Sequence, residues 1–252
     1  TILTNTTSGG VWTTSNAAVA TVNTITGNVT GVTAGTATIT YTYTNSNGCT
    51  SAVTTTVTIN ALPVVAAITG TTSVCEGATT TLASTTTGGV WSTANTATAT
   101  INSTTGVVTG VAAGTTTMTY TVTNANGCTS SVSTALVVNA IPQVAAISGT
   151  TEVCVGLTTA LANATASGVW TSSNTAVATI DASGVVTGVA AGSTTITYTV
   201  TTNGCTANAQ AVVNVNALPT LAAIGGTMNA CIGSSTILTN TTSGGVWTTS
   251  NA

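Results

Sequence analysis

The chain has 252 residues and carries almost no charge, since it contains three acidic residues and no lysine, arginine or histidine. An ordinary domain is about 25% charged. Nucleic acid is excluded as a partner, and so is electrostatic binding to anionic lipid, because both interactions require lysine or arginine. Without histidine and lysine, general acid–base chemistry has almost no candidate groups, so we do not expect an enzyme.

The same composition leaves little for a metal ion or a cofactor. The carboxylates Glu76, Glu152 and Asp181 do not form a sequence cluster of the kind that calcium sites require, and no metal-type Cys-x-x-Cys pair is present. We therefore expect no metal site and no cofactor. The longest apolar stretches, such as Val64–Ile68, are far too short to span a bilayer, so we expect no membrane insertion.

An internal repeat is the strongest organisational signal. The segments 1–17 and 236–252 both read TILTNTTSGGVWTTSNA. From the first copy to the second, the tryptophans Trp12, Trp91, Trp170 and Trp247 recur at a nearly constant spacing of about 79 residues. A fixed period indicates one folded unit that is used many times. We therefore expect that the chain is a segment of a longer tandem array with three units per superperiod.

Three proline-containing segments mark the boundaries between units. They read NALP, NAIP and NALP, at Asn60–Pro63, Asn139–Pro142 and Asn216–Pro219. Proline restricts its own φ and disfavours helix in the residue before it, so these segments are natural joints. We predict the C-terminal portion of one repeat at 1–61, complete repeats at 62–140 and 141–217, and the N-terminal portion of a further repeat at 218–252.

Within the first repeat the sequence predicts short strands around residues 11–12, 20–22, 29–32, 36–44 and 53–59. The segment Thr36–Thr44 alternates apolar residues with threonine, and the same pattern returns at Thr115–Thr123 and Ser193–Thr201. This period of two is typical of a half-buried antiparallel strand. About seven short strands in about 79 residues, with frequent turns and nothing helical, indicate an all-β fold of tandem immunoglobulin-like sandwiches.

Aromatic residues recur at fixed positions and are the predicted core. The four tryptophans named above are expected at the centre of a sandwich sheet, rather than as platforms for stacking a ligand. Three tyrosines, one in each alternating strand, are expected on the same core face: Tyr41, Tyr120 and Tyr198.

One segment carries a resemblance to a known family. Val11–Thr40 contains a tryptophan, then SN, VATV, GNVTGV and AGTATIT, and Val90–Thr119 and Val169–Thr197 carry the same pattern. This pattern resembles the bacterial Ig-like domain of group 2. The remaining half of the unit, including Ile68–Leu82 and Thr123–Val132, resembles cysteine-bearing Ig-like repeats of giant surface adhesins in Bacteroidota. The resemblance implies an exported, multi-domain surface protein and brings no catalytic residues with it.

Six cysteines lie at two fixed positions of the repeat and are disulfide candidates. Regular placement in a charge-poor chain is typical of an oxidising, extracellular compartment, whereas the alternative is free thiols buried as small apolar side chains. The cysteines that follow Asn-Gly are Cys49, Cys128 and Cys205. The cysteines that stand two residues before a glycine are Cys75, Cys154 and Cys231.

Three types of pairing are open. Within one repeat, Cys75 would meet Cys128 and Cys154 would meet Cys205; across one linker, Cys49 would meet Cys75; and a staple between adjacent repeats would join Cys75 to Cys205. In an Ig-like topology Cys75 and Cys128 lie at opposite ends of the unit, about 25 Å apart, whereas bridged Cα atoms lie within about 7 Å. That geometry favours the staple, but the within-repeat bond is the simpler assumption and the usual one for such repeats.

The expected function is structural. We expect a stalk or filament segment of a secreted bacterial cell-surface adhesin, which supplies length, stiffness and protease resistance outside the cell. Its expected partners are neighbouring repeats and other copies of the same nearly neutral chain, with surface glycans as a further candidate. The alternatives are a glycan-binding or ice-binding adhesion module, and a spacer in a larger secreted enzyme.

Overall fold

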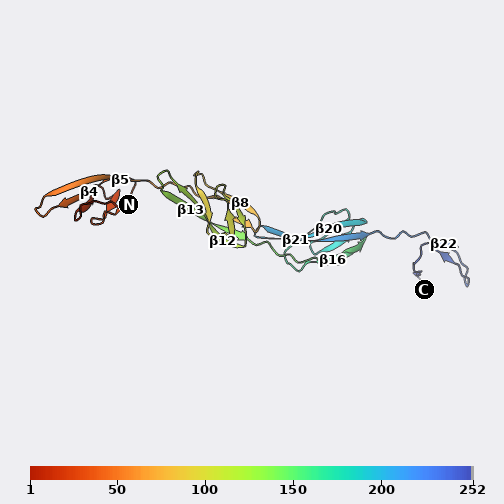
Figure 1. Ribbon diagram of the computed structural model, residues 1–252. Helices are drawn as coiled ribbons and strands as arrows, with labels where there is room; N and C mark the ends of the chain where they lie inside the picture. The colour runs from red at the N-terminus through yellow and green to blue at the C-terminus, as the bar shows by residue number, and fades with distance from the viewer. Residues whose placement is uncertain (251–252) are drawn as a thin grey trace. The chain divides into compact units, whose positions relative to one another are not determined.

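The computed structural model describes residues 1–250, in which every regular element is a strand (Figure 1). Accordingly, this range holds no apolar helix of the length that crosses a membrane. The chain divides into two compact units, Thr1–Ile141 and Pro142–Ala252, and the division falls in the second proline-containing linker.

The first unit begins with five strands. They are β1 (Val11–Thr14), β2 (Ala20–Val22), β3 (Val29–Gly31), β4 (Gly35–Thr44) and β5 (Thr50–Ile59). One sheet has the order β1-β4-β5 and a second consists of β2 and β3, with all pairs antiparallel. A small core lies between them and includes Trp12, Ile39 and Tyr41.

The rest of the first unit is a complete sandwich of two four-stranded sheets. Its strands are β6 (Thr69–Gly70), β7 (Ser73–Cys75), β8 (Thr79–Ala83), β9 (Val90–Thr93), β10 (Ala99–Ile101), β11 (Val107–Gly110), β12 (Gly114–Thr123) and β13 (Thr129–Asn139). The sheets have the orders β10-β11-β8-β6 and β7-β13-β12-β9. The pairing of β7 with β13 is parallel, and the other pairs are antiparallel.

The second unit repeats this arrangement. Its strands are β14 (Ser148–Gly149), β15 (Glu152–Cys154), β16 (Thr158–Ala162), β17 (Val169–Ser172), β18 (Ala178–Ile180), β19 (Val185–Gly188), β20 (Gly192–Thr202) and β21 (Cys205–Asn216). The sheet orders are β14-β16-β19-β18 and β15-β21-β20-β17, again with one parallel pair, β15 and β21. A two-stranded pair, β22 (Gly225–Gly226) and β23 (Leu238–Thr239), follows.

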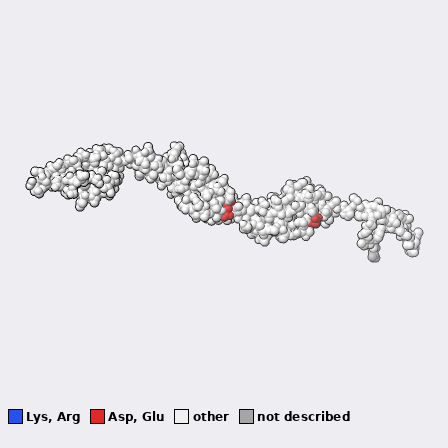
Figure 2. Space-filling view, in the orientation of Figure 1, with Lys and Arg blue, Asp and Glu red and all other residues white. Residues whose placement is uncertain are grey.

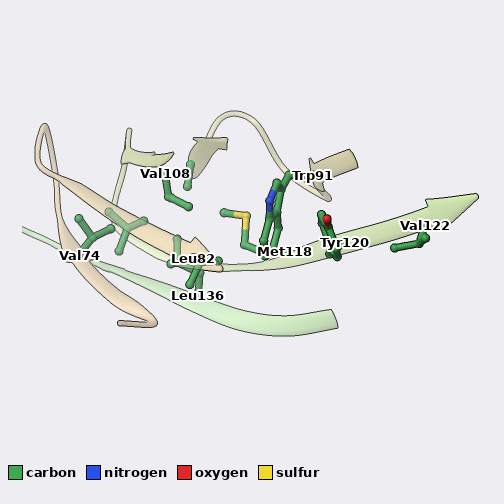
Figure 3. Close-up of a cluster of buried hydrophobic side chains, with 10 residues drawn as sticks. Val74, Leu82, Trp91, Val108, Met118, Tyr120, Val122 and Leu136 are labelled. Carbon is green, nitrogen blue, oxygen red and sulfur yellow. The ribbon is translucent and has the colours of Figure 1, made fainter. Parts of the chain in front are cut away.

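The long hairpin of β12 and β13 shows which side chains enter the core of the complete sandwich and which face outward. On β12 the residues Thr116, Met118, Tyr120 and Val122 are buried, while most of the intervening threonines are partly or fully exposed. Side chains alternate between the two faces of a strand, so every second position enters the core. In Figure 3, Trp91, Met118, Tyr120 and the nearby aliphatic residues gather between the two sheets of this sandwich.

The prediction of an all-β chain of tandem immunoglobulin-like sandwiches is confirmed. Each complete repeat has eight strands instead of about seven, because two-residue and three-residue strands such as β6 and β7 carry no readable alternation. The predicted strand at 53–59 is longer, Thr50–Ile59, because its first residues pair with β4 although they are exposed on both faces.

Candidate functional site

The repeated aromatic pair is the most constant feature of the molecule. Trp91 on β9 lies directly opposite Tyr120 on β12, with ring centroids 4.6 Å apart and planes inclined by 40°. The equivalent pairs Trp12–Tyr41 and Trp170–Tyr198 have the same centroid distance, with planes inclined by 48° and 50°. Inclined rings at this separation are a favourable aromatic arrangement.

The tyrosine hydroxyl of each pair forms hydrogen bonds with the loop that precedes the tryptophan. Tyr120 Oη accepts a hydrogen bond from the backbone N–H of Gly89 at 2.9 Å and donates one to the carbonyl of Thr86 at 2.8 Å. The hydroxyls of Tyr41 and Tyr198 form the same two bonds in their own repeats. A Cβ atom on Gly89 would lie 2.4 Å from Tyr120 Cζ, so the close approach requires glycine. We did not predict this role, although the recurring glycine two residues before each tryptophan is a signal for it.

The four predicted core tryptophans do not share one environment. Trp12 and Trp91 are buried and Trp170 is partly buried against its core, whereas Trp247 is 55% exposed and departs from the expectation of a core position. An open cavity of about 300 Å³ beside Trp247 is lined by residues such as Leu221 and Ile224.

The carboxylates accept hydrogen bonds from nearby backbone N–H groups and side-chain amides. Glu152 on β15 accepts hydrogen bonds from the amide groups of Asn214 (2.7 Å) and Asn216 (2.9 Å) on the neighbouring strand β21. These bonds stabilise the ionised form and lower the pKa of Glu152. Glu76 accepts from the backbone N–H of Ala113 at 2.8 Å. Within residues 1–250 no three histidine, cysteine or acidic residues gather as metal ligands would.

Asp181 performs a similar task in a turn. Its Oδ1 accepts hydrogen bonds from the Ser183 hydroxyl at 2.7 Å and from the backbone N–H of Val185 at 2.9 Å. Both bonds lower the pKa of Asp181, and the hydroxyl contributes more. On the face that Figure 2 shows, acidic atoms form only small, separate spots.

The cysteines lie at the two ends of the strands in each complete repeat. Cys75 is the last residue of β7 and lies opposite Asn139, the last residue of β13. Cys128 directly precedes the first residue of the same strand β13. In the next repeat Cys154 lies opposite Asn216, and Cys205 is the first residue of β21.

The within-repeat disulfides are not formed. Cys75 and Cys205 are disulfide-bonded, whereas Cys128 and Cys154 are free, and so are Cys49 and Cys231. The pairing of Cys49 with Cys75 is therefore also absent. The physical reason within one repeat is strand length, because the whole of β13, from Thr129 to Asn139, separates Cys128 from the position of Cys75. That strand spans about 36 Å at ~3.3 Å per residue, which far exceeds the ~7 Å limit for bridged Cα atoms.

The Asn-Gly-Cys turn lies against the linker that enters its repeat. Asn124 Oδ1 accepts hydrogen bonds from the backbone N–H groups of Asn126 and Cys128, each at 3.0 Å. The amide nitrogen of Asn124 donates to the carbonyl of Ala61, in the first linker, at 2.8 Å. One asparagine therefore shapes the turn and holds the linker. We did not single out this residue, because its bond to Ala61 joins positions that are far apart in the sequence.

The match to a family model identifies the kind of domain. The model of the bacterial Ig-like domain (group 2) matches residues 2–57 and 136–213, together more than half of the chain. No curated protein matches. The similar solved structures include domains 1–6 of the surface layer protein SbsC, at 19% identity and a TM-score of 0.27, with 87% of this chain and 37% of that chain covered.

Two further structures show the range of the similarity. A SusE-like surface-located polysaccharide-binding protein from the Bacteroides thetaiotaomicron heparin utilisation locus is 11% identical, with a TM-score of 0.35 and coverages of 72% and 43%. Domains EC1–3 of Drosophila N-cadherin are 12% identical, with a TM-score of 0.25 and coverages of 86% and 92%. The chain thus spans less than half the length of the surface layer and SusE-like proteins.

Proposed function

Because the chain belongs to the bacterial Ig-like domain (group 2) family, we propose that it is a stalk or filament segment of a secreted bacterial cell-surface adhesin of the Bacteroidota type. In this role each repeat supplies length outside the cell, and no repeat performs chemistry. The proposal concerns a protein in which this chain is a set of repeats within a larger array.

The observation that carries the proposal is one set of internal contacts that recurs in successive repeats. Three successive repeats place a tryptophan and a tyrosine 4.6 Å apart and fasten the same loop with the tyrosine hydroxyl. An array in which every unit is built around the same internal contacts resists unfolding at each unit rather than at one weak point. The absence of lysine and arginine also removes every cleavage site for trypsin-like proteases.

We also propose that the stalks associate laterally with copies of themselves. The sheet that contains the tryptophan ends at β9, whose outer edge pairs with no other strand of its sheet, although the backbone N–H of Trp91 donates a hydrogen bond to the carbonyl of Ser103, in the turn between β10 and β11, at 2.9 Å. The first residue of β9, Val90, is 58% exposed, and the equivalent residues Val11 and Val169 are also exposed. Natural proteins usually protect such edges with charged side chains, and this chain has no lysine or arginine to do so. Surface glycans are the alternative way to cover these edges.

The test is imaging and sedimentation of the whole chain together with two matched variants. Val90→Glu with Val169→Glu places charge on two edge strands, whereas Val64→Glu with Leu218→Glu adds the same charge at exposed linker residues. We expect rods that assemble at high concentration for the parent chain and the linker variant, and loss of assembly for the edge variant. Monodisperse behaviour of the unglycosylated parent chain at high concentration would overturn the association.

Images of the parent chain test the stalk separately. We expect short rods of defined length, because each repeat is a folded block and the linkers between blocks are short and contain proline. Particles in which the repeats take many mutual orientations would contradict the stalk. Binding of polysaccharides or of ice to individual repeats, with no assembly, would instead indicate an adhesion module.

A further inference from the structure

We propose that the parallel pair of strands in each complete repeat is a mechanical clamp, meaning the contact that must break before tension can unfold the repeat. The pair consists of β7 and β13 in the repeat at 62–140 and of β15 and β21 in the repeat at 141–217. This role rests on the proposed stalk function, because only a stalk carries tension from one end of a repeat to the other. Each clamp lies wholly within its own repeat.

The chain enters and leaves the repeat at 62–140 at opposite ends of β13. It arrives beside the turn between β12 and β13, where the Asn124 side chain donates a hydrogen bond to the carbonyl of Ala61 at 2.8 Å. It leaves after Asn139, the last residue of β13. Tension that is applied through the chain therefore pulls the two ends of the repeat apart along the direction of β13.

The strand β7 joins the entering part of the chain to the strand from which the chain leaves. Ser73–Cys75 lies opposite Val137–Asn139, and the two segments run in the same direction. Tension pulls β7 toward its first residue and β13 toward its last, so the two strands are drawn past each other along their common axis. Because the hydrogen bonds of a parallel pair are evenly spaced along the strands, they share this load. Val74 and Val138, in the middle of the two segments, are buried in the core, so sliding also disturbs the packing.

Hydrogen bonds hold the pair at both of its ends. The backbone N–H of Val137 donates to the carbonyl of Thr72 at 2.9 Å, and the backbone N–H of Glu76 donates to the carbonyl of Asn139 at 3.0 Å. The Asn139 amide also donates to the Ser73 hydroxyl at 2.8 Å, which adds a side-chain bond across the same two strands. Movement of β7 along β13 breaks all of these bonds.

The earlier contacts of the entering chain do not join the two loaded ends. Before β7, the backbone N–H and carbonyl of Ala66 form hydrogen bonds with the hydroxyls of Thr86 and Ser84, and the two residues of β6 pair with β8. Since β8 belongs to the other sheet, neither end of the chain pulls on it directly. Release of these contacts leaves β7 paired with β13, so we expect the repeat to stay folded until this pair breaks.

The repeat at 141–217 carries a variant of the same clamp with a charged group. Glu152 has the place on β15 that Ser73 has on β7, and its carboxylate accepts hydrogen bonds from the amides of Asn214 and Asn216 on β21. Hydrogen bonds to an ionised group are roughly twice as strong as those between neutral groups. The backbone bond at the end of the pair is also kept, from Val155 to the carbonyl of Asn216 at 3.0 Å. We therefore expect this repeat to resist a higher force than the repeat at 62–140.

Force extension of the whole chain tests the clamp, with an excess of dithiol present so that no disulfide shares the load. Glu76→Pro removes the backbone N–H that donates to Asn139. The matched control is Glu76→Ala, because both variants lose the side-chain bond to Ala113 and only the proline variant loses the backbone donor. At constant force we expect one repeat to unfold about fivefold faster in the proline variant than in the alanine variant. Equal rates would overturn the clamp.

A proline outside the clamp separates mechanical from ordinary stability. Ala94→Pro removes a backbone hydrogen bond of similar length, from Ala94 to the carbonyl of Thr117 at 2.9 Å. We expect this variant to unfold at a lower urea concentration but to keep the unfolding rate of the parent chain under force, because this part of the repeat is still folded when the clamp breaks. Faster unfolding under force with Ala94→Pro than with Glu76→Pro would show that another contact bears the load.

Exchange of side chains between the two clamps gives a second test at exposed positions. Ser73→Glu with Val137→Asn gives β7 and β13 the groups of the other clamp, and Glu152→Ser with Asn214→Val does the reverse. We expect the first exchange to slow the faster unfolding event and the second to accelerate the slower one, each by about fivefold. Circular dichroism establishes that each variant is folded, and unchanged rates in both would overturn the clamp.

The clamp and the stalk can fail independently. A chain that forms rods, but whose unfolding rates do not respond to these variants, would overturn the clamp and keep the stalk. A chain whose rates respond as expected, but whose images show repeats in many mutual orientations, would contradict the stalk and support the clamp as a property of the single repeat.

Discussion

Trp91 and Tyr120 lie opposite each other on β9 and β12 with their ring centroids 4.6 Å apart, and Tyr120 also fastens the loop that precedes β9. One side chain thus joins the core to the segment that leads into the edge strand. The two other complete pairs repeat this arrangement, so conclusions about one pair apply to all three. These contacts and the nearby turns lead to four predictions.

Removal of the Tyr120 hydroxyl should loosen the loop without disturbing the ring stack. In Tyr120→Phe the N–H of Gly89 and the carbonyl of Thr86 lose their partners in a part-buried position. We expect a loss of about 2 kcal/mol in the free energy of unfolding, measured by urea titration with tryptophan fluorescence. The control is Tyr43→Phe at a 36% exposed tyrosine, which should change stability by less than about 0.5 kcal/mol. Equal effects of both changes would contradict the role of the hydroxyl.

A methyl group at Gly89 should be far more harmful than the same group at Gly245. The new Cβ would lie 2.4 Å from Tyr120 Cζ, whereas at Gly245 it meets no atom within 4 Å. Both glycines follow another glycine and precede Val-Trp, so the local sequence is matched. We expect Gly89→Ala to cost about 1–3 kcal/mol through overpacking, and Gly245→Ala to leave the urea midpoint unchanged. A tolerated Gly89→Ala would show that the loop can move away from the tyrosine.

One turn position exchanges glycine for serine among the repeats. Gly88 has φ of 80°, and its counterpart Ser167 has φ of 64°, in the left-handed region that favours glycine. Gly88→Ser should therefore destabilise its repeat, and Ser167→Gly should stabilise its own, each by roughly 1 kcal/mol. Thermal unfolding of the two variants checks the opposite signs. Changes of the same sign would mean that another contact decides the conformation.

Stability should depend on pH only in the acid range. The folded pKa values of Glu152 and Asp181 are lowered by hydrogen bonds from Asn214 and Ser183 and their neighbours. A lowered folded pKa gives stability that is present above the unfolded value, near 4.5 for Glu and 3.8 for Asp, and is lost as the pH falls through the folded value. We expect flat stability between about pH 5 and 8, because the chain has no histidine, and a decline below about pH 4.5.

Two variants test whether Glu152 and Asp181 cause the loss of stability at acid pH. Glu152→Gln and Asp181→Asn should each make the acid loss shallower while changing the fold little, since both carboxylates lie at the surface. Chemical unfolding at several pH values measures the slope. A parent chain whose stability is constant down to about pH 2, or a double variant with an unchanged slope, would contradict this assignment.

Much of the fold could be predicted because its long strands carry a strong pattern. The alternation of Thr115–Thr123 corresponds to β12, which spans Gly114–Thr123, and the tryptophan spacing indicates one unit of about 79 residues. Alternation is readable because each buried position recurs every second residue. The strands β6 and β7 are too short to show any period, so neither they nor the parallel pairing of β7 with β13 could be read from the sequence.

The sequence by itself determined that the chain is a nearly uncharged, all-β repeat with an aromatic core in each unit, because composition and periodicity are properties of the chain alone. Only the tertiary structure decided which groups meet. It set Tyr120 against Gly89, and it placed Cys75 level with Asn139 and far along the strand from Cys128. The physical reason is that strand pairing brings together residues that are distant in sequence, and a disulfide forms only between atoms that this pairing places within reach.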